Sequence, residues 1–556
     1  MRRKLWEVKE LTSEAKGLGK KYNISPFLAQ IFLNRKIKDA DFSSFLKPEL
    51  SQLYSPYMLP DMDKAVERIT KAAKAKERIL LVGDYDVDGI TSLAIFYEFI
   101  KEFPDTFSFY IPHRVNDGYG FGMEAIIKAK KENRSLIICF DCGTNSFSQI
   151  ELARSEGIDV IVVDHHHSRN NLSNAVAFIN PKREDSTYPF FDLTSAALSF
   201  KLLQGLKNLP CWEVLDLVAL SLICDVAPLK GENRILLKAS LKVLKESPRP
   251  AIKALCQASS LKQQNLDTFH IGYILGPRIN ASGRVAHAQD SLEIFLTDDE
   301  REACDIAAKL GDYNQLRKGI GADVLKQAER IVERDFIESS AIIVSGENWH
   351  RGVLGIVASR LADKYYRPSF VISFEGDIGR GSARSIHSVH LMKALDKCAN
   401  LLTTYGGHKK AAGIQISKRD LGVFTEKLNS FIKEDSAPQD FIPVLSVDLK
   451  MKFADIDVNF IEEIEILKPF GEENPAPLFA SYNISKKTPP KKISSGYSLW
   501  LSDDDKTYEG IIYDKDVLEI INYGDNFDLV YSLGKNVYHN IPRLIIRDCK
   551  LFGGRS

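Results

Sequence analysis

The sequence of 556 residues has no excess of charge of either sign, because its 74 Lys and Arg residues equal its 74 Asp and Glu residues. A formal net charge of zero excludes a chain that attracts polyanions over its whole surface, so a polyanion site must come from local clusters of Lys and Arg. No segment approaches the roughly 20 apolar residues that a membrane-spanning helix needs. Residues 1–7 are charged and lack the apolar core of a signal peptide, so we expect a cytoplasmic protein without membrane contact.

Cysteine is also scarce, with eight residues scattered through the chain, which is typical of a protein in a reducing cytoplasm. Cys139 and Cys142 form a CxxC pair, but no second pair follows at the spacing of a zinc site. Their apolar surroundings favour a coincidence at the end of a strand. The hydrophobic content of 44% indicates a globular chain, and its length is too great for one core. We therefore expect three or four domains.

Three aspartates alternate within residues 83–89, namely Asp84, Asp86 and Asp88. The apolar run before them (78–82) predicts a buried strand, and the run after them (90–96) predicts a helix. Carboxylates packed onto one turn repel one another, and a divalent cation both relieves that repulsion and prefers oxygen ligands. Taken alone, the turn is equally explained as a solvated acidic turn.

The same pattern occurs twice more along the chain. Residues 135–140 form an apolar run that ends at Asp141, and residues 159–163 form another that ends at Asp164. In an open parallel sheet, ligands bind outside the carboxyl ends of the strands, near the point where the strand order reverses. We therefore expect six side chains to converge on one crevice: Asp86, Asp88, Asp141, Asp164, His165 and His166.

One further acidic residue follows a mostly apolar helix predicted over residues 214–224. Asp225 stands at the end of this helix, shortly before Pro228. A buried carboxylate needs a partner, which a metal ion, a helix cap or a salt bridge could supply. The three strand-end clusters favour the metal ion.

The pattern of apolar residues and glycines divides the chain into five parts. These are an N-terminal helical extension (1–75), an α/β domain (76–230), a helical connector (231–339), a second α/β domain (340–435) and a β-rich C-terminal domain (440–556). Apolar positions recur every three or four residues from Ile306 to Val324, which predicts a helix joining two lobes. Gly319 and Gly321 interrupt it, each at a cost of about 1 kcal/mol relative to Ala, and permit a bend.

Two glycine-rich stretches in the second α/β domain, 379–385 and 406–413, are predicted to be loops. Glycines let backbone N–H groups approach an anion, and Arg offers bidentate contact to phosphate. We favour phosphate binding over ordinary turns with solvated cations because basic residues stand beside small ones: Arg380, Arg384, Lys409 and Lys410.

The C-terminal domain has short strands, with lysines and aromatic residues close together. The lysines are Lys486, Lys487, Lys491 and Lys492, and the aromatics are Tyr497, Trp500 and Tyr538. This combination is typical of a small barrel on which single-stranded bases stack. The same aromatics could instead belong to the core.

Several of these motifs resemble a known family. Residues 83–89 and 164–166 resemble the DHH phosphoesterase superfamily, and residues 406–408 and 411–413 resemble its associated DHHA1 domain. Other stretches resemble the bacterial exonucleases of that superfamily that are specific for single-stranded DNA. They are residues 111–114, 118–120, 276–284, 349–358 and 467–475, and the resemblance covers about residues 60–556.

The resemblance implies a multidomain α/β fold, in which a DHH parallel-sheet domain and a DHHA1 domain are joined by a long helix and followed by an OB-type β-barrel. It implies a hydrolase that removes nucleotides from single-stranded DNA in the 5′-to-3′ direction, with two Mn²⁺ or Mg²⁺ ions, in DNA recombination and repair. It also implies a monomer, whose partners are single-stranded DNA with a 5′ end, a single-strand-binding protein and a helicase.

The resemblance also assigns roles to residues. It implies that five side chains hold the metals: Asp86, Asp88, Asp141, His165 and Asp225. Asp84 and His166 stand beside them, at positions that contact phosphate or water. Relatives often carry a metal-binding His at the position of Val82, so Asp84 is the candidate replacement. Arg114, Ser382, Arg384, Gly407 and His408 are implied to bind the 5′-terminal part of the strand, and Asn280 and Arg284 the scissile phosphate.

The ligand types alone indicate the chemistry. Two metal ions can activate a water and stabilise the leaving oxygen of a phosphodiester. Oxygen ligands with one imidazole suit Mn²⁺ or Mg²⁺ better than zinc. Two alternatives remain: a small DHH–DHHA1 phosphodiesterase acting on short oligonucleotides or cyclic dinucleotides, and a non-enzymatic replisome scaffold. The former class lacks the region 440–556, and the latter predicts eroded ligands.

Overall fold

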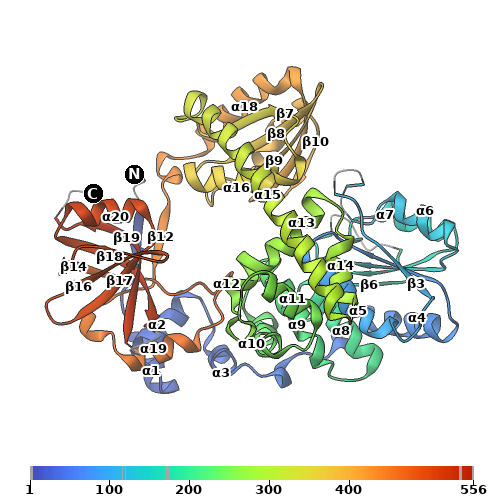
Figure 1. Ribbon diagram of the computed structural model, residues 1–556, viewed down its shortest axis with the longest axis horizontal. Helices are drawn as coiled ribbons and strands as arrows, with labels where there is room; N and C mark the ends of the chain where they lie inside the picture. The colour runs from blue at the N-terminus through green and yellow to red at the C-terminus, as the bar shows by residue number, and fades with distance from the viewer. Residues whose placement is uncertain (1–3, 115–116, 119, 169–173, 537–540, 554–556) are drawn as a thin grey trace. The chain divides into compact units, whose positions relative to one another are not determined.

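The computed structural model describes residues 4–114, 117–118, 120–168, 174–536 and 541–553, so Tyr119 and Tyr538 lie outside the described residues. The chain forms two compact units (Figure 1). The larger unit comprises Leu50–Ala227 and Gly231–Phe441, and the smaller comprises Met1–Glu49, Pro228–Lys230 and Ile442–Ser556. Among the described residues, no helix is long and apolar enough to cross a membrane.

The larger unit begins with a five-stranded parallel sheet. Its strands are β2 (Ile79–Gly83), β3 (Phe107–Tyr110), β4 (Leu136–Phe140), β5 (Asp159–Val163) and β6 (Ala177–Ile179), in the order β3-β2-β4-β5-β6. Every residue of β2 and β4 is buried, as expected for parallel strands covered on both faces. The strand order reverses between β2 and β4, and the sequence predicted a binding site at the carboxyl ends of strands near such a point.

Helices cover both faces of this sheet (Figure 1). On one face, α6 (Met123–Lys131) and α7 (Phe147–Ser155) pack on Leu80, Val82 and Ile137. On the other lie α4 (Met62–Lys74), α5 (Val87–Ile100) and α8 (Ser195–Lys207). The apolar helix α9 (Leu215–Cys224) packs against α5, α8 and α10 (Gly231–Glu246), and this packing brings its C-terminal end, with Asp225, close to Asp88.

The connector is helical, as predicted. It contains α11 (Pro250–Ala258), α12 (Thr268–His270), the π-helical segment η6 (Ile271–Leu275), α13 (Gly276–Val285), α14 (Gln289–Leu296) and α15 (Glu300–Asp335). The 36-residue helix α15 runs through Gly319 and Gly321 without a break, so the permitted bend does not occur. Its first half packs on α11, α13 and α14, and its second half packs on α16 and β7 through Val324, Ala328 and Val332. A long helix therefore joins the two α/β domains.

The second α/β domain has a mixed sheet. Its strands are β7 (Ile342–Glu347), β8 (Ser369–Glu375), β9 (Ile378–Arg384), β10 (Leu402–Gly407) and β11 (Ala411–Ser417), in the order β10-β11-β9-β8-β7. Helix α16 (Arg351–Tyr365) and α15 cover one face, and α17 (Leu391–Lys397) and α18 (Leu421–Asp435) cover the other.

The prediction of a glycine-rich loop at 379–385 was wrong, because residues 379–384 lie in strand β9. A Cβ atom at Gly379 would lie 2.6 Å from the Phe374 ring, and one at Gly381 would lie 2.8 Å from Ile372. Here glycine serves close packing inside a sheet, which the sequence does not distinguish from a flexible loop. The second predicted loop, 406–413, comprises the end of β10, a short turn and the start of β11.

The C-terminal region of the smaller unit is a barrel, as predicted. Its strands are β13 (Leu449–Lys450), β14 (Phe479–Lys486), β15 (Lys491–Ile493), β16 (Gly496–Ser502), β17 (Thr507–Ile512), β18 (Asn526–Lys535) and β19 (Pro542–Leu551). The ring β14–β18–β19–β17–β16 closes through pairing of β16 with β14, which leaves no free edge in these five strands. Helices α19 (Val458–Ile466) and α20 (Lys515–Tyr523) complete it.

The structure divides the helical extension expected over residues 1–75. Strand β1 (Leu5–Val8) pairs in parallel with β12 (Val444–Val447). Helices α1 (Ser13–Tyr22), α2 (Pro26–Asn34) and α3 (Phe42–Leu46) share one core with the barrel. Only residues from Leu50 onward, including α4, belong to the larger unit. This division depends on contacts between residues more than 400 positions apart, which no local sequence pattern reveals.

Candidate active site

The acidic residues predicted at the strand ends lie together at the carboxyl edge of the sheet. Asp84 follows β2, Asp141 follows β4 and Asp164 follows β5. Ligand atoms of Asp84, Asp86 and Asp141 lie within 4.8 Å of one another, and so do those of Asp88, His165 and Asp225. The structure thus brings together residues from three strand ends and one helix end.

His165 stands at the centre of this group. Its Nε2 atom lies 3.3 Å from Oδ1 of Asp141, 3.6 Å from Oδ2 of Asp88 and 3.7 Å from Oδ2 of Asp225. Burial lowers the pKa of His165 to about 4. The imidazole is therefore neutral at neutral pH, which is the form that ligates a metal.

The surrounding carboxylates repel one another in a site with little solvent. Burial raises the pKa of Asp141 well above its usual value, and the charges of Asp88 and Asp86 raise it further. The pKa values of Asp84 and Asp225 are raised for the same two reasons, burial and neighbouring carboxylates. Oδ1 of Asp84 is buried and accepts no hydrogen bond from any described residue. Such a donor set fits divalent cations, whose charge would offset the repulsion.

Asp164 has a different part, because it orients the two histidines. It accepts hydrogen bonds from the backbone N–H groups of His165, at 2.7 Å, and Thr144, at 3.0 Å, and lies 2.7 Å from Nδ1 of His166. Burial alone would disfavour the Asp164 carboxylate and the His166 imidazolium. The ion pair between them outweighs this effect, so it lowers the pKa of Asp164 and raises the pKa of His166 to about 9. His166 is therefore an imidazolium at neutral pH, at the edge of the carboxylate group.

Asp88 is held by groups that the sequence reasoning missed. Its carboxylate accepts hydrogen bonds from the backbone N–H groups of Ser195, at 2.8 Å, and Ala196, at 2.9 Å, in the first turn of α8. The Ser221 hydroxyl donates a third bond, at 2.7 Å, and lies 2.6 Å from the hydroxyl of Thr194. One signal was available, because Ser221 precedes Asp225 by four residues and so shares its face of α9.

Val82, the position at which the family resemblance implies a His, is fully buried in the core beneath α6 and α7. Asp86 caps the N-terminus of α5 and accepts bonds from the backbone N–H groups of Asp88 and Gly89, at 2.9 and 3.3 Å. One oxygen of Asp86 is thus fixed by the helix while its ligand atom lies beside Asp84 and Asp141.

Three of the predicted substrate-binding arginines lie near one another. The guanidinium of Arg114 stacks 4.6 Å from the centroid of the Tyr85 ring, a partner that the sequence reasoning missed. Burial lowers the pKa of Arg284 to about 10, and the charge of Arg114 adds to this effect. Burial also lowers the pKa of Arg384, again with a contribution from Arg114. Guanidinium groups held this close form a site for an anion.

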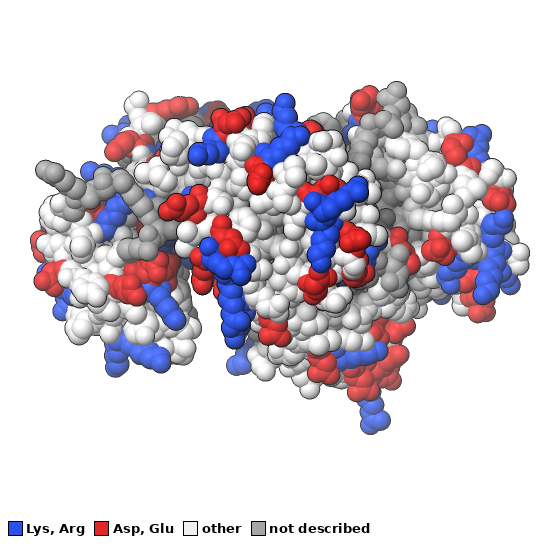
Figure 2. All heavy atoms as spheres, turned by 90° about the horizontal axis from the view of Figure 1, so that it is seen from above, with Lys and Arg blue, Asp and Glu red and all other residues white. Residues whose placement is uncertain are grey.

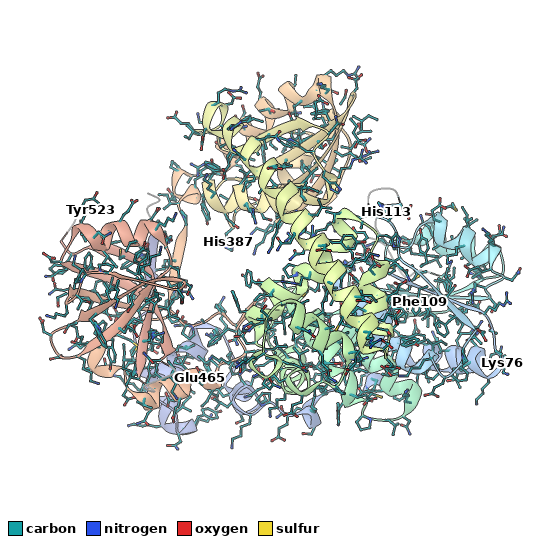
Figure 3. All side chains as sticks on the ribbon, viewed as in Figure 1. Lys76, Phe109, His113, His387, Glu465 and Tyr523 are labelled. Atoms are coloured by element: carbon teal, nitrogen blue, oxygen red, sulfur yellow. The ribbon has the colours of Figure 1, made fainter. Side chains whose placement is uncertain are left out.

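Helix α13 connects this cluster to the acidic group. The side-chain carbonyl of Asn280 accepts a hydrogen bond from the backbone N–H of Val87, at 3.1 Å, which leaves the amide N–H groups as donors. Arg284 donates to the backbone carbonyl of Gly352, at 3.3 Å. Beside α13, the rings of His113 (labelled in Figure 3) and His287 lie 6.0 Å apart, so the loop that carries Arg114 reaches the end of this helix.

The remaining predicted residues lie on the second α/β sheet. Arg380, Ser382 and Arg384 alternate along β9 and so share one face. Gly407 ends β10 with φ 150°, and a Cβ atom there would collide with the carbonyl oxygen of Ala411. His408 is exposed in the following turn. The pKa of His167 is lowered by burial and by Lys182, and His408 makes a smaller contribution, which places His408 near His167.

The barrel presents some of its predicted nucleic-acid-binding residues to solvent. Trp500 is 41% exposed, and Lys487, Lys491 and Lys492 are exposed. Lys486, in contrast, donates to the backbone carbonyls of Ile521 and Gly524, so it supports α20. Figure 2 shows basic and acidic side chains intermixed on one face of the molecule, in line with the zero net charge.

Three domain families match the chain: the DHH family N-terminal domain over residues 78–222, the DHHA1 domain over 338–434 and the RecJ OB domain over 447–548. The single-stranded-DNA-specific exonuclease RecJ of Bacillus subtilis is 32% identical over 98% of this chain and 70% of its own length. The RecJ exonuclease of Salmonella typhimurium is 31% identical over 82% of this chain and 83% of its own length.

A solved structure has the same fold. The crystal structure of RecJ from Thermus thermophilus in complex with Mn²⁺ superposes with a TM-score of 0.84 and 24% identity, covering 100% of this chain and 81% of that chain. This solved structure therefore has the same combination of a parallel-sheet domain, a second α/β domain and a barrel.

Proposed function

The chain belongs to the RecJ family of single-stranded-DNA-specific exonucleases, and from that premise we propose that it removes nucleotides from the 5′ end of single-stranded DNA with two divalent cations. The observation that carries this proposal is the buried acidic group around His165, whose Nε2 lies within 3.7 Å of three carboxylates. Five side chains would hold the ions, Mn²⁺ or Mg²⁺: Asp86, Asp88, Asp141, His165 and Asp225. Asp84 would add a sixth ligand, a carboxylate oxygen, in place of the His that the family resemblance implies at the position of Val82.

Cations held by these residues would supply an activated water and a positive charge beside the leaving oxygen. The other roles belong to the chain's own residues. His166 carries a proton at neutral pH because Asp164 raises its pKa to about 9, so it contacts a phosphate oxygen or donates that proton. The amide of Asn280 and the guanidinium of Arg284 hold the scissile phosphate beside Asp86 and Asp88.

Arg114, Ser382, Arg384, Gly407 and His408 bind the terminal 5′-phosphate. The proximity of Arg114 to Arg284 and Arg384 supports this assignment, because burial of three like charges is offset by a bound dianion. Binding of the terminal phosphate sets the direction of digestion. We expect strands with a 5′-phosphate to be digested faster than strands with a 5′-hydroxyl.

The test is digestion of 5′- and 3′-end-labelled single strands with Mn²⁺, using the full chain and the variants Asp86→Ala and Asp141→Ala. The 5′ label should be released first as a mononucleotide, and both variants should lose activity. Asp298→Ala, at an exposed position before α15, is the matched control and should retain full activity. Degradation from the 3′ end, or full activity of both site variants, would falsify the proposal.

A phosphodiesterase for short oligonucleotides is distinguished by substrate length. Deleting residues 440–556 is a poor test, because the barrel covers Leu28, Phe32 and Phe42 of α2 and α3. Trp500→Ala and Lys491→Ala leave this core intact. In an exonuclease, these variants should digest long strands more slowly and a dinucleotide at the wild-type rate. In an enzyme for short substrates, the variants should match wild type on both substrates.

The proposed cellular setting follows from the substrate. An enzyme that needs separated strands works with a helicase that exposes them and a single-strand-binding protein that coats them. We also propose that the chain acts as a monomer. All eight cysteines are unpaired, which supports the cytoplasm.

A further inference from the structure

Phe269 and Tyr273 form a stacked pair of aromatic rings in the connector that is open to solvent. Their centroids lie 5.1 Å apart, and their planes meet at 26°. Phe269 is 57% exposed and Tyr273 is 74% exposed. Contiguous apolar surface left in water in this way marks an interaction site.

The helical segment that carries the pair is fixed against the active site. It begins at α12, where Asp267 caps the helix by accepting a hydrogen bond from the backbone N–H of His270, at 3.0 Å. A Cβ atom at Gly272 would lie 3.2 Å from Ile223, and one at Gly276 would collide with Cys224. Both contacts press the π-helical segment η6 onto the last turn of α9, directly before Asp225. A π-helical turn within a helix is frequently found at a functional site.

The same continuous helix carries the proposed contacts to the scissile phosphate. Asn280 lies seven positions after Tyr273, which corresponds to about 10 Å of helix, and Arg284 lies about 6 Å beyond Asn280. The arginine cluster for the 5′-phosphate lies at the Arg284 end. The aromatic pair therefore lies at the opposite end, on the side from which the rest of a strand would arrive.

We propose that Phe269 and Tyr273 form a stacking platform for the bases of single-stranded DNA on the 3′ side of the scissile bond. Aromatic faces bind unpaired bases of any sequence with about 1–3 kcal/mol per base, whereas bases in a duplex are stacked within it. Arg278, five positions after Tyr273 on the same helix, adds a positive charge to this segment: it donates to the backbone carbonyl of Ile274 at 3.0 Å, and its buried Nε has no hydrogen-bond partner among the described residues. This inference rests on the proposed exonuclease function and adds a subsite to it.

The experiment compares the full chain with the double variant Phe269→Ala/Tyr273→Ala. KM is measured with Mn²⁺ for a 20-nucleotide strand and for a 5′-phosphorylated dinucleotide, which is too short to reach the platform. We expect KM for the long strand to rise about tenfold, equivalent to about 1.4 kcal/mol, while KM and kcat for the dinucleotide stay unchanged. The single variant Tyr273→Phe keeps both aromatic rings and should have the wild-type KM for the long strand. Ile337→Ala, at a 65% exposed apolar residue after α15, should leave KM unchanged for both substrates.

Three results would overturn the platform. The first is an unchanged KM for the long strand, and the second is an equal loss for both substrates, which would indicate a purely structural role. The third is a wild-type dimer in size-exclusion chromatography that the double variant abolishes without a change in KM, which would assign the rings to a contact between copies. Failure of the exonuclease proposal is distinguishable from all three, because wild-type protein would then not digest the long strand at all.

Discussion

The hydroxyl of Ser221 donates a hydrogen bond of 2.7 Å to Oδ1 of Asp88, so a side chain on α9 positions a carboxylate at the start of α5. Ser221 itself lies 2.6 Å from the hydroxyl of Thr194, the residue that caps α8. Three helices are thereby tied to one proposed metal ligand. Partners of this kind orient a ligand before the metal binds.

We expect Ser221→Ala to weaken Mn²⁺ binding about 10–100-fold, the usual effect of losing a hydrogen bond to a metal ligand. Calorimetric titration of the folded variant with Mn²⁺ measures this directly. Ser199→Ala is the matched control, because Ser199 is equally buried in α8 and its hydroxyl has no hydrogen-bond partner among the described residues. Equal affinities of Ser221→Ala and wild type would show that Asp88 needs no such support.

Asp141→Asn should stabilise the metal-free protein and abolish its stabilisation by metal. The substitution removes a buried charge that Asp88 and Asp86 repel, and Asn tolerates the φ of 59° at this position. In wild type, Mn²⁺ at 100 times its Kd should add about 2.7 kcal/mol to the free energy of unfolding. Urea unfolding with and without Mn²⁺ measures both effects. A metal-free variant less stable than wild type would contradict the repulsion argument.

The His166–Asp164 pair predicts a pH dependence. Because the folded-state pKa of His166, about 9, exceeds the value of about 6.5 expected in the unfolded chain, the pair stabilises fully below about pH 6.5. This contribution is lost as the pH rises through about 9. We expect about 1 kcal/mol, since the imidazole is partly exposed and solvent screens the pair. NMR titration of His166 should give a midpoint near 9 in metal-free protein and a lower one in Asp164→Asn; a wild-type midpoint near 6.5 would refute the assignment.

Gly319→Ala should stabilise the chain by about 0.5–1 kcal/mol, because alanine favours the helix and a Cβ atom there meets no atom within 4 Å. Gly276→Ala provides the contrast: its Cβ atom would collide with Cys224, so we expect a loss of stability. Thermal unfolding of both variants tests this pair. If Gly319→Ala raises the Tm but lowers kcat, then α15 bends during turnover.

The sequence predicted those parts of the molecule whose signals are local. Strands β2, β4 and β5 are mostly apolar runs that are each followed directly by an aspartate. Their parallel pairing brings Asp84, Asp141 and Asp164 to the same edge of the sheet. Strand β9 was missed because Gly379 and Gly381 lack the side chains from which a strand pattern is recognised. The hydrogen bond between Ser221 and Asp88 was missed because it joins residues 133 positions apart through helix packing.

Strand β1 pairs with β12, and Leu5 faces Val444, a separation of 439 residues (444 minus 5). At a synthesis rate of 5–20 residues per second, roughly 20 to 90 s pass between the appearance of these two strands at the ribosome. During that interval Leu28, Phe32 and Phe42 have no barrel to cover them, although residues 50–441 can already form their own cores. Residues 5–46 therefore reach their native contacts long after they are made, and during that interval this segment of the nascent chain is exposed to chaperones and proteases.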